Sequence, residues 1–193
     1  LRFTPATRHE NACATGSAAI HAALADIRAG KTRVALVVGA EKMTASSPAQ
    51  IADALLAASY RREEAQVEAG FAGIFGHIAQ TYFQRHGDAS AAIAAKNHRH
   101  GVANPYAQMR RDLGFDFCRQ VSEKNPIVAG PLKRTDCSLV SDGAAALVLA
   151  DAETARGMAR AVGFRAAVQV NDFLPMSKRD PIAFEGCELA WER

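Results

Sequence analysis

The sequence predicts an α/β protein, because apolar segments of strand type alternate with segments of helical period. The run at 34–39, Val-Ala-Leu-Val-Val-Gly, is continuously apolar and directly follows an alanine-rich helical segment. A second run at 144–150 has the same character. Uninterrupted apolar runs of this length are typical of strands covered on both faces of a parallel sheet. A strand, a helix and a strand in this order imply a right-handed crossover.

The first third of the chain is predicted to contain an extended segment, a helix, a strand and a loop. Residues 8–12 are expected to be a short extended segment that leads into a helix starting at Cys13. This helix ends at Gly30, and it is nearly apolar all round, so burial is expected on every side. The strand at 34–39 comes next. Residues 41–66 then read as a loop, because Ser46-Ser47-Pro48 interrupts them.

The middle of the chain is predicted to be mainly helical. Apolar residues recur at helical spacing between Phe71 and Phe83, where glycines three residues apart indicate close packing. Asp88 can cap a further helix that continues through Lys96. Residues 97–114 are polar and read as irregular, and a short helix follows through residues 117–121.

The last third contains the remaining predicted elements. Ser141-Asp142-Gly143 is a turn signal before the strand at 144–150. Residues 153–160 are expected to be helical, and residues 164–170 alternate in the manner of a half-buried strand. The stretch 181–193 resembles the start of a helix.

Cys13 is the strongest candidate for chemistry. It lies in Asn-Ala-Cys-Ala-Thr-Gly-Ser at the expected first turn of a helix. Unpaired backbone N–H groups and the positive end of the helix dipole favour the thiolate there, which is the nucleophilic form. The small neighbours leave room for a substrate. The alternative is that Cys13 is a small buried hydrophobe.

Composition excludes several classes of protein. The chain has 193 residues, 49% apolar and 22% charged, as expected of an ordinary globular protein. The net charge of +3 is weak and its cations are scattered, which argues against a nucleic-acid partner. The four cysteines lack metal-binding spacing, so no metal site is expected. No apolar run is long enough to span a membrane.

Three separated blocks of sequence resemble the thiolase superfamily, and in particular its sterol-carrier-protein-type branch. The first is Cys-Ala-Thr-Gly-Ser-Ala-Ala-Ile-His at 13–21, followed by the strand and Ala-Glu-Lys-Met-Thr at 40–44. The second is Lys-Asn-His-Arg-His at 96–100, continued by Asn-Pro-Tyr-Ala-Gln at 104–108. The third combines Pro-Leu at 131–132, Asp-Cys-Ser at 136–138 and Ser-Asp-Gly-Ala-Ala-Ala at 141–146.

The resemblance implies a layered α/β fold with a mixed sheet covered by helices, incomplete in this chain. By this comparison, residues 1–152 are the latter part of the N-terminal half, with a loop region at about 61–130. Residues 153–193 begin the C-terminal half. The second half normally supplies the base histidine and a second cysteine, so the isolated chain is expected to be inactive. The absence of an initiator methionine also suggests that the sequence begins inside a longer protein.

The resemblance also implies a function. Thiolases cleave a 3-oxoacyl-CoA with CoA, or run the reverse Claisen condensation, through an acylated cysteine. Cys13 matches that nucleophile. CoA is then a co-substrate, and no separate cofactor is needed. A homodimer is implied, with the segment before Cys13 near the partner. The implied location is the cytoplasm, or the peroxisome in a eukaryote.

Other candidate residues carry two interpretations. The resemblance places His98 and His100 in a loop region over the CoA-binding face, and Asn97 and His98 are the candidate substrate-binding residues. By themselves, the two histidines fit solvated loop side chains. His21 is expected to be a core histidine. Four cations could bind CoA phosphates or simply be solvated: Lys96, Arg99, Arg110 and Arg111.

Two alternatives remain open for the function. One is a thiolase-like aldolase that acts on steroid side-chain CoA thioesters without acylating a cysteine. The other is a non-catalytic scaffold derived from a thiolase. Formation of an acyl adduct on Cys13 distinguishes the thiolase-type acyltransferase from both the aldolase and the scaffold.

Overall fold

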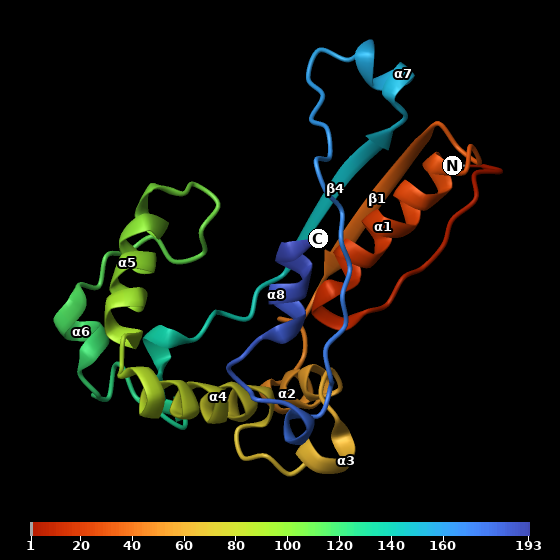
Figure 1. Ribbon diagram of the computed structural model, residues 1–193. Helices are drawn as coiled ribbons and strands as arrows, with labels where there is room; N and C mark the ends of the chain where they lie inside the picture. The colour runs from red at the N-terminus through yellow and green to blue at the C-terminus, as the bar shows by residue number, and fades with distance from the viewer. Residues whose placement is uncertain (1) are drawn as a thin grey trace. The chain divides into compact units, whose positions relative to one another are not determined.

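The computed structural model describes residues 2–193 (Figure 1). They form two compact units. Unit 1 contains the residues up to Lys42 together with Asp142–Gln169, and unit 2 contains Met43–Ser141 and Val170–Arg193. Strands and helices occur in both units, which confirms the predicted α/β class.

Unit 1 is a two-stranded ribbon with a helix beside it. Its elements are the 3₁₀ turn η1 (Ala12–Ala14), helix α1 (Thr15–Arg28), strands β1 (Val34–Glu41) and β4 (Gly143–Ala150), and helix α7 (Ala152–Arg156). Residues 8–11 lead into η1 without regular structure. Helix α7 ends earlier than the predicted 153–160 helix, at Gly157.

Strands β1 and β4 are antiparallel, so the predicted parallel pairing is wrong. Val34 pairs with Ala150 and Glu41 pairs with Gly143, without a register shift. A continuous apolar run is commonest in parallel sheets because both of their faces are covered, but the run by itself does not fix the direction of the neighbouring strand. Ion pairs lie beyond both ends of the ribbon: Arg33 Nε to Asp151 Oδ2 at 2.8 Å, and Lys42 Nζ to Asp142 Oδ2 at 3.0 Å.

Only one face of this ribbon is covered within unit 1. Helix α1 packs beside β1 (Figure 1), and Leu149 on the covered face is buried. The opposite face leaves large aliphatic side chains exposed: Val34, Leu36, Val38 and Val148. No residue of α1 is fully buried. The prediction that the strands and the helix are covered on all sides is therefore wrong for unit 1, since a single helix shields a single face.

Unit 2 is mostly helical. It contains α2 (Pro48–Leu56), α3 (Arg61–Glu64), α4 (Gly70–His86), α5 (Ser90–Ala103), α6 (Phe115–Arg119), β2 (Ile127–Ala129), β3 (Leu132–Lys133), η2 (Arg134–Asp136), η3 (Met176–Lys178) and α8 (Glu185–Glu192). Helices α4 and α6, and the α8 region, were predicted.

Helix α2 corrects the expectation of a loop over residues 41–66. Ser47 caps it, because its hydroxyl accepts from the Gln50 N–H while Gln50 Oε1 accepts from the Ser47 N–H at 3.0 Å. Pro48 occupies the first helical position, where its missing N–H costs nothing. The same Ser-Pro pair that suggested a break therefore starts a helix.

Helix α4 packs tightly against the β2–β3 hairpin through glycine. A Cβ placed on Gly76 would lie 2.9 Å from the Ala129 carbonyl oxygen, and one placed on Gly130 would lie 2.9 Å from the Gly76 carbonyl oxygen. Gly130 also has a φ of +51°, which favours glycine. The predicted close packing at the α4 glycines is confirmed at Gly76.

A buried polar network joins α5, α6 and η2. Asn125 is fully buried, its Nδ2 donates to the Phe117 and Gln120 carbonyls at 3.0 and 3.1 Å, and its Oδ1 accepts from the Thr135 N–H at 3.0 Å. Lys133 Nζ lies 3.1 Å from Ser90 Oγ and 3.0 Å from Asp136 Oδ2. The network fixes the start of α5 against the hairpin.

Two further predictions differ from the structure. Residues 97–103 were expected to be irregular, but they continue α5, which ends at Ala103 where Asn104 becomes extended. Residues 164–170 have no strand partner among residues 2–193 and are irregular. An alternating pattern forms a strand only where a neighbouring strand accepts its hydrogen bonds.

The last segment of unit 2 is held by polar contacts. Buried Glu64 accepts from the Tyr60 and Met176 N–H groups at 2.8 and 3.1 Å. Arg85 Nη1 lies 2.6 Å from Asp180 Oδ2. Within residues 2–193, no helix is sufficiently long and apolar to cross a membrane.

Candidate functional site

Cys13 lies in the tight turn that opens α1. It is the middle residue of η1, and its side chain is exposed. Thr15, two residues later, is the first residue of α1. The structure therefore places the thiol at the start of the helix, as the sequence predicted, and leaves it accessible from solvent.

Two side chains hold the backbone of this turn. Glu10 Oε1 accepts from the Ala12 N–H at 2.7 Å. The Thr15 hydroxyl accepts from the Asn11 N–H at 2.8 Å, and it lies 2.7 Å from the Ala12 carbonyl oxygen, to which it donates. The sequence analysis counted Thr15 only among the small neighbours of Cys13, and it assigned no role to Glu10. Their polarity and their spacing around the cysteine were the available signal.

The residue before the cysteine has an unusual backbone conformation. Ala12 has a φ of +46°, in the left-handed region that costs a residue with a Cβ roughly 1–2 kcal/mol. Such strain persists only where surrounding contacts fix it, and it is frequent at functional sites. The space around Gly16 is open, because a Cβ placed there would meet nothing within 4 Å. The turn thus presents an exposed Cys13 on a constrained backbone.

Asn97 and His98 lie on α5, in unit 2, whereas Cys13 belongs to unit 1. Asn97 is exposed. His98 is half-buried, one helical turn after the buried Ala94. Both side chains are thus carried by a helix, which corrects the expectation that they lie in a loop. A helix fixes their direction more firmly than a loop does.

The four predicted phosphate-binding cations lie on α5 or shortly after it. Lys96 and Arg99 are exposed on the helix. Arg110 is exposed, and its Nε and Nη2 donate to the Val102 carbonyl oxygen at 3.3 Å, while Arg111 follows it. The structure brings these cations to one part of unit 2.

The other cysteines have different surroundings. Cys118 is fully buried and Cys137 is half-buried, and burial raises the pKa of both thiols because it disfavours the thiolate. Cys187 is exposed, like Cys13. His21 is half-buried on α1, so it is less enclosed than the core position expected for it. Among residues 2–193, no three His, Cys, Asp or Glu side chains are grouped to hold a metal ion.

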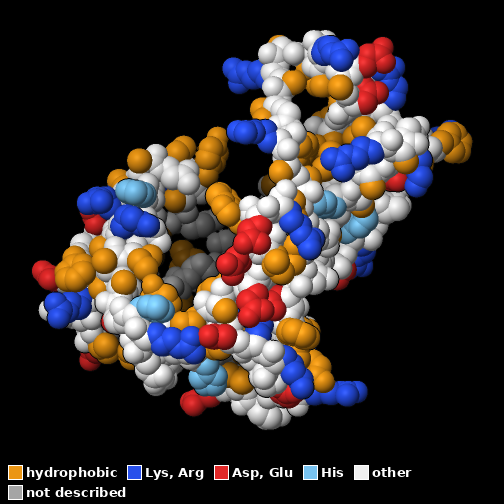
Figure 2. Space-filling view, viewed as in Figure 1, with side chains coloured by type: hydrophobic (Ala, Val, Ile, Leu, Met, Phe, Trp, Pro, Cys, Tyr) orange, Lys and Arg blue, Asp and Glu red, His pale blue; other side chains and the backbone are white. Residues whose placement is uncertain are grey.

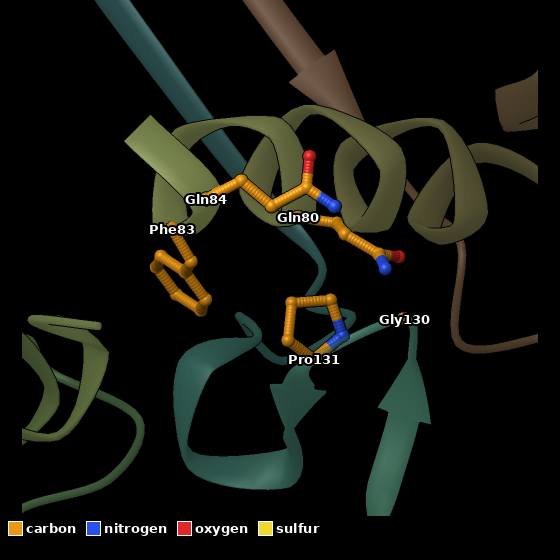
Figure 3. Close-up of a pocket in the computed structure, with 5 residues that line it drawn as sticks. All are labelled: Gln80, Phe83, Gln84, Gly130 and Pro131. Carbon is orange, nitrogen blue, oxygen red and sulfur yellow. The ribbon is translucent and has the colours of Figure 1, made fainter. Parts of the chain in front are cut away.

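A cavity of about 510 Å³ lies between α4 and the turn after β2 (Figure 3). It is lined by Gln80, Phe83, Gln84, Gly130 and Pro131. Phe83 and Pro131 make its surface largely apolar, and two side-chain amides lie at its edge. None of the predicted site residues lines it. No sequence signal identified it, because its shape depends on how closely Gly76 approaches the hairpin.

Comparison with protein families identifies one matching domain. The model described as thiolase, N-terminal domain, matches residues 2–114. The matched range includes Cys13, Asn97 and His98, and it excludes β4 and everything after it.

Several curated proteins are similar to the chain. An acetyl-CoA acetyltransferase of Methanocaldococcus jannaschii is 34% identical over 200 residues, which cover all of this chain and 50% of that protein. The benzoylsuccinyl-CoA thiolase subunit BbsB of Thauera aromatica is 29% identical, over 86% of this chain and 41% of that protein. Sterol carrier protein 2 of Oryctolagus cuniculus is 29% identical, over 90% of this chain and 33% of that protein. The chain thus spans half or less of the length of these relatives.

Proposed function

Because the chain belongs to the thiolase family, we propose that it is part of an acyl-CoA acyltransferase whose nucleophile is Cys13. The observation that carries the proposal is the turn at the start of α1. It exposes the thiol, holds its backbone through Glu10 and Thr15, and strains Ala12. The names of the relatives, which include acetyl-CoA acetyltransferase and thiolase, support the same chemistry.

The proposed first step is transfer of an acyl group to sulfur. Cys13 thiolate attacks the thioester carbonyl carbon of an acyl-CoA, the carbon–sulfur bond to CoA breaks, and CoA leaves as a thiolate that takes up a proton. The product is an acyl thioester on Cys13. For a 3-oxoacyl-CoA the thiolate attacks the 3-oxo carbonyl carbon instead, the bond between C2 and C3 breaks, and the enolate of acetyl-CoA leaves and takes up a proton to give acetyl-CoA. A second acceptor then removes the acyl group.

Helix α1 can assist this step. It begins at Thr15, two residues after Cys13, so the positive end of its dipole favours the oxyanion that forms during attack. The side chains of the N-cap residues Asn11 and Ala14 make no capping hydrogen bond. The Asn11 and Ala12 N–H groups are occupied by the Thr15 hydroxyl and the Glu10 carboxylate, so the N–H groups proposed to stabilise the oxyanion are those that follow Ala12.

Substrate binding is assigned to unit 2. We infer that Asn97 and His98 contact the substrate and that the nearby cations bind the phosphates of CoA. CoA is then a co-substrate, and the reaction uses no other cofactor. Arginine and lysine suit phosphate because their hydrogen bonds to it are charge-assisted.

The oligomeric state, the domain division and the cellular location of the parent enzyme are also proposals. The resemblance supports a homodimer with the segment before Cys13 near the partner. Residues 1–152 would belong to the first half of the enzyme and residues 153–193 to the second. The resemblance further supports a cytoplasmic location, or a peroxisomal one in a eukaryote. Acylation without turnover is expected of this chain by itself.

Mass spectrometry tests the central proposal. The chain is incubated with acetyl-CoA, and peptides are examined for a thioester-bound acetyl group. We expect the adduct on Cys13 and its loss in Cys13→Ser. Cys187→Ser is the matched control, because Cys187 is also exposed, and it should retain the adduct. Equal labelling of both cysteines, or no label on Cys13, contradicts the acyl-enzyme mechanism.

A further inference from the structure

We propose that Glu10 is a positioning residue for acyl transfer at Cys13, an inference that rests on the proposed function. Glu10 acts through the backbone before the cysteine, because its Oε1 accepts from the Ala12 N–H at 2.7 Å. The conformation of this backbone sets the direction of the N–H groups that follow Ala12. Acyl transfer should therefore depend on Glu10, although its carboxylate takes no part in the bonds that form and break.

The contact of Glu10 offsets the strain at Ala12. The φ of Ala12 is +46°, in the left-handed region that is unfavourable for a residue with a Cβ. A hydrogen bond from an N–H group to a carboxylate is charge-assisted, and it is therefore stronger than one between neutral groups. Because the strained residue itself donates this bond, the contact stabilises the conformation that Ala12 adopts.

Both peptide groups that flank Ala12 have a partner. Glu10 holds the peptide between Asn11 and Ala12 through its N–H. The Thr15 hydroxyl and the Thr15 N–H hold the next peptide through the Ala12 carbonyl oxygen. That next peptide also contains the Cys13 N–H, and since a peptide group is planar, its two ends turn together. Loss of the Glu10 contact would free the first peptide and release the φ of Ala12.

These contacts are local. They join residues no more than five positions apart, and Thr15 Oγ1 also lies 3.3 Å from Glu10 Oε1. The turn can therefore form in a chain that spans half or less of the length of its relatives. The charged surface gives no comparable indication of a site, because Figure 2 shows acidic and basic side chains interspersed over the face that it draws.

Two reactions of the same thiol separate positioning from a general effect on Cys13. Attack on a thioester moves negative charge onto the carbonyl oxygen, where oriented N–H groups stabilise it. Alkylation by iodoacetamide forms a carbon–sulfur bond and expels iodide, so no oxyanion develops. A looser turn slows both reactions, but loss of the oriented N–H groups slows only acyl transfer. The ratio of the acylation rate to the alkylation rate therefore reports on positioning.

Mass spectrometry of the full chain measures both rates at Cys13, with acetyl-CoA and with iodoacetamide. Glu10→Ala should lower the acylation rate about tenfold more than the alkylation rate, because misplacing stabilising groups is costly. Glu10→Gln keeps an oxygen that can accept from the Ala12 N–H, so it should keep the ratio within about threefold of that of the unmodified chain. Glu41→Ala is the matched control, since exposed Glu41 accepts from the Lys42 N–H at 3.1 Å, and it should change neither rate.

The possible outcomes separate this inference from the proposed function. An unchanged ratio in Glu10→Ala overturns the inference, while acylation of Cys13 still supports the proposed function. A ratio that falls equally in Glu10→Gln assigns the effect to the charge of Glu10 and also overturns the inference. If the unmodified chain is not acylated at Cys13, the proposed function fails and the inference fails with it. A ratio that falls in Glu10→Ala and recovers in Glu10→Gln supports the positioning role.

Discussion

Lys42 Nζ lies 3.0 Å from Asp142 Oδ2, although the two residues are 100 positions apart in the sequence. They flank the point where the chain leaves β1 and returns to β4. The antiparallel register makes this necessary, because Glu41 pairs with Gly143. The chain therefore leaves unit 1 after Lys42 and re-enters it at Asp142, at the same end of the ribbon.

The Lys42–Asp142 pair is expected to contribute little to stability. Their side chains are 72% and 34% exposed, so water screens the attraction. A double-mutant cycle with Lys42→Gln and Asp142→Asn, measured by urea unfolding, should give a coupling of about 0.5 kcal/mol. A coupling free energy several times larger would contradict this expectation and show that the ion pair stabilises the end of the ribbon.

Gly76→Ala should destabilise unit 2. Its new Cβ would lie 2.9 Å from the Ala129 carbonyl oxygen, so α4 or the hairpin must move, at a cost of roughly 1–3 kcal/mol. Gly16→Ala is the control, because that Cβ meets nothing within 4 Å and its effect should stay within about 1 kcal/mol. Urea unfolding of both variants measures the difference, and equal effects would contradict the close approach.

Lys133→Met should be among the most damaging substitutions in the chain. The variant leaves the buried Asp136 carboxylate without its cation, which costs roughly 3–5 kcal/mol. Lys31→Met removes the lysine of an exposed pair, Lys31–Asp26, and should cost at most about 1 kcal/mol. Thermal unfolding measures the loss of stability in both variants. A loss of at most about 1 kcal/mol for Lys133→Met would contradict the prediction and show that water reaches the Asp136 carboxylate.

Thr15→Val should reduce the reactivity of Cys13. It removes the hydroxyl that accepts from the Asn11 N–H and donates to the Ala12 carbonyl, so the strained turn is held less firmly. The loss of stability should be about 1 kcal/mol. Alkylation by iodoacetamide at neutral pH, read by mass spectrometry, should slow at Cys13 and stay constant at Cys187. Thr32→Val, which removes a hydroxyl that donates to the Val34 carbonyl, is the control and should change neither rate.

Asp151 should make the fold sensitive to acid. A hydrogen bond from Arg33 and one from the Thr154 N–H lower the pKa of this carboxyl well below its usual range. Because the pKa of Asp151 is lower in the folded state, its ionised carboxylate stabilises the fold at pH values above the unfolded-state pKa of about 3.9. This stabilisation is lost as the pH falls through the folded-state pKa. Asp151→Asn should therefore be less stable near neutral pH but lose less stability on acidification. Urea unfolding across the acid range checks this; parallel curves would contradict it.

Periodicity predicted the elements that need only their own residues. Helix α4 follows from apolar residues at helical spacing, and β1 and β4 follow from continuous apolar runs. The motifs predicted the thiolase family, which the match over residues 2–114 confirms, and sterol carrier protein 2 is among the similar proteins.

Features that depend on distant residues were not predictable. The direction of β4 relative to β1 depends on the path of residues 43–141, and residues 164–170 lack a strand to pair with among residues 2–193.

Helix α2 could have been predicted, since Ser47 and Gln50 have the spacing of a capping box.

The candidate site was predicted in part. The position of Cys13 at a helix start required only its neighbours, and the structure agrees. The left-handed conformation of Ala12 was not predictable, because alanine rarely adopts that conformation. The contact of Glu10 with the Ala12 N–H was signalled only by the polarity and position of Glu10.

The uncovered face of the ribbon has a practical consequence for handling the chain in solution. Leu36 and Val148 lie opposite each other on that face, and β1 and β4 pair only with each other among residues 2–193. Open strand edges beside bare aliphatic groups promote growth into insoluble polymers. Turbidity should rise with protein concentration, and a lysine in place of Leu36 should delay its onset.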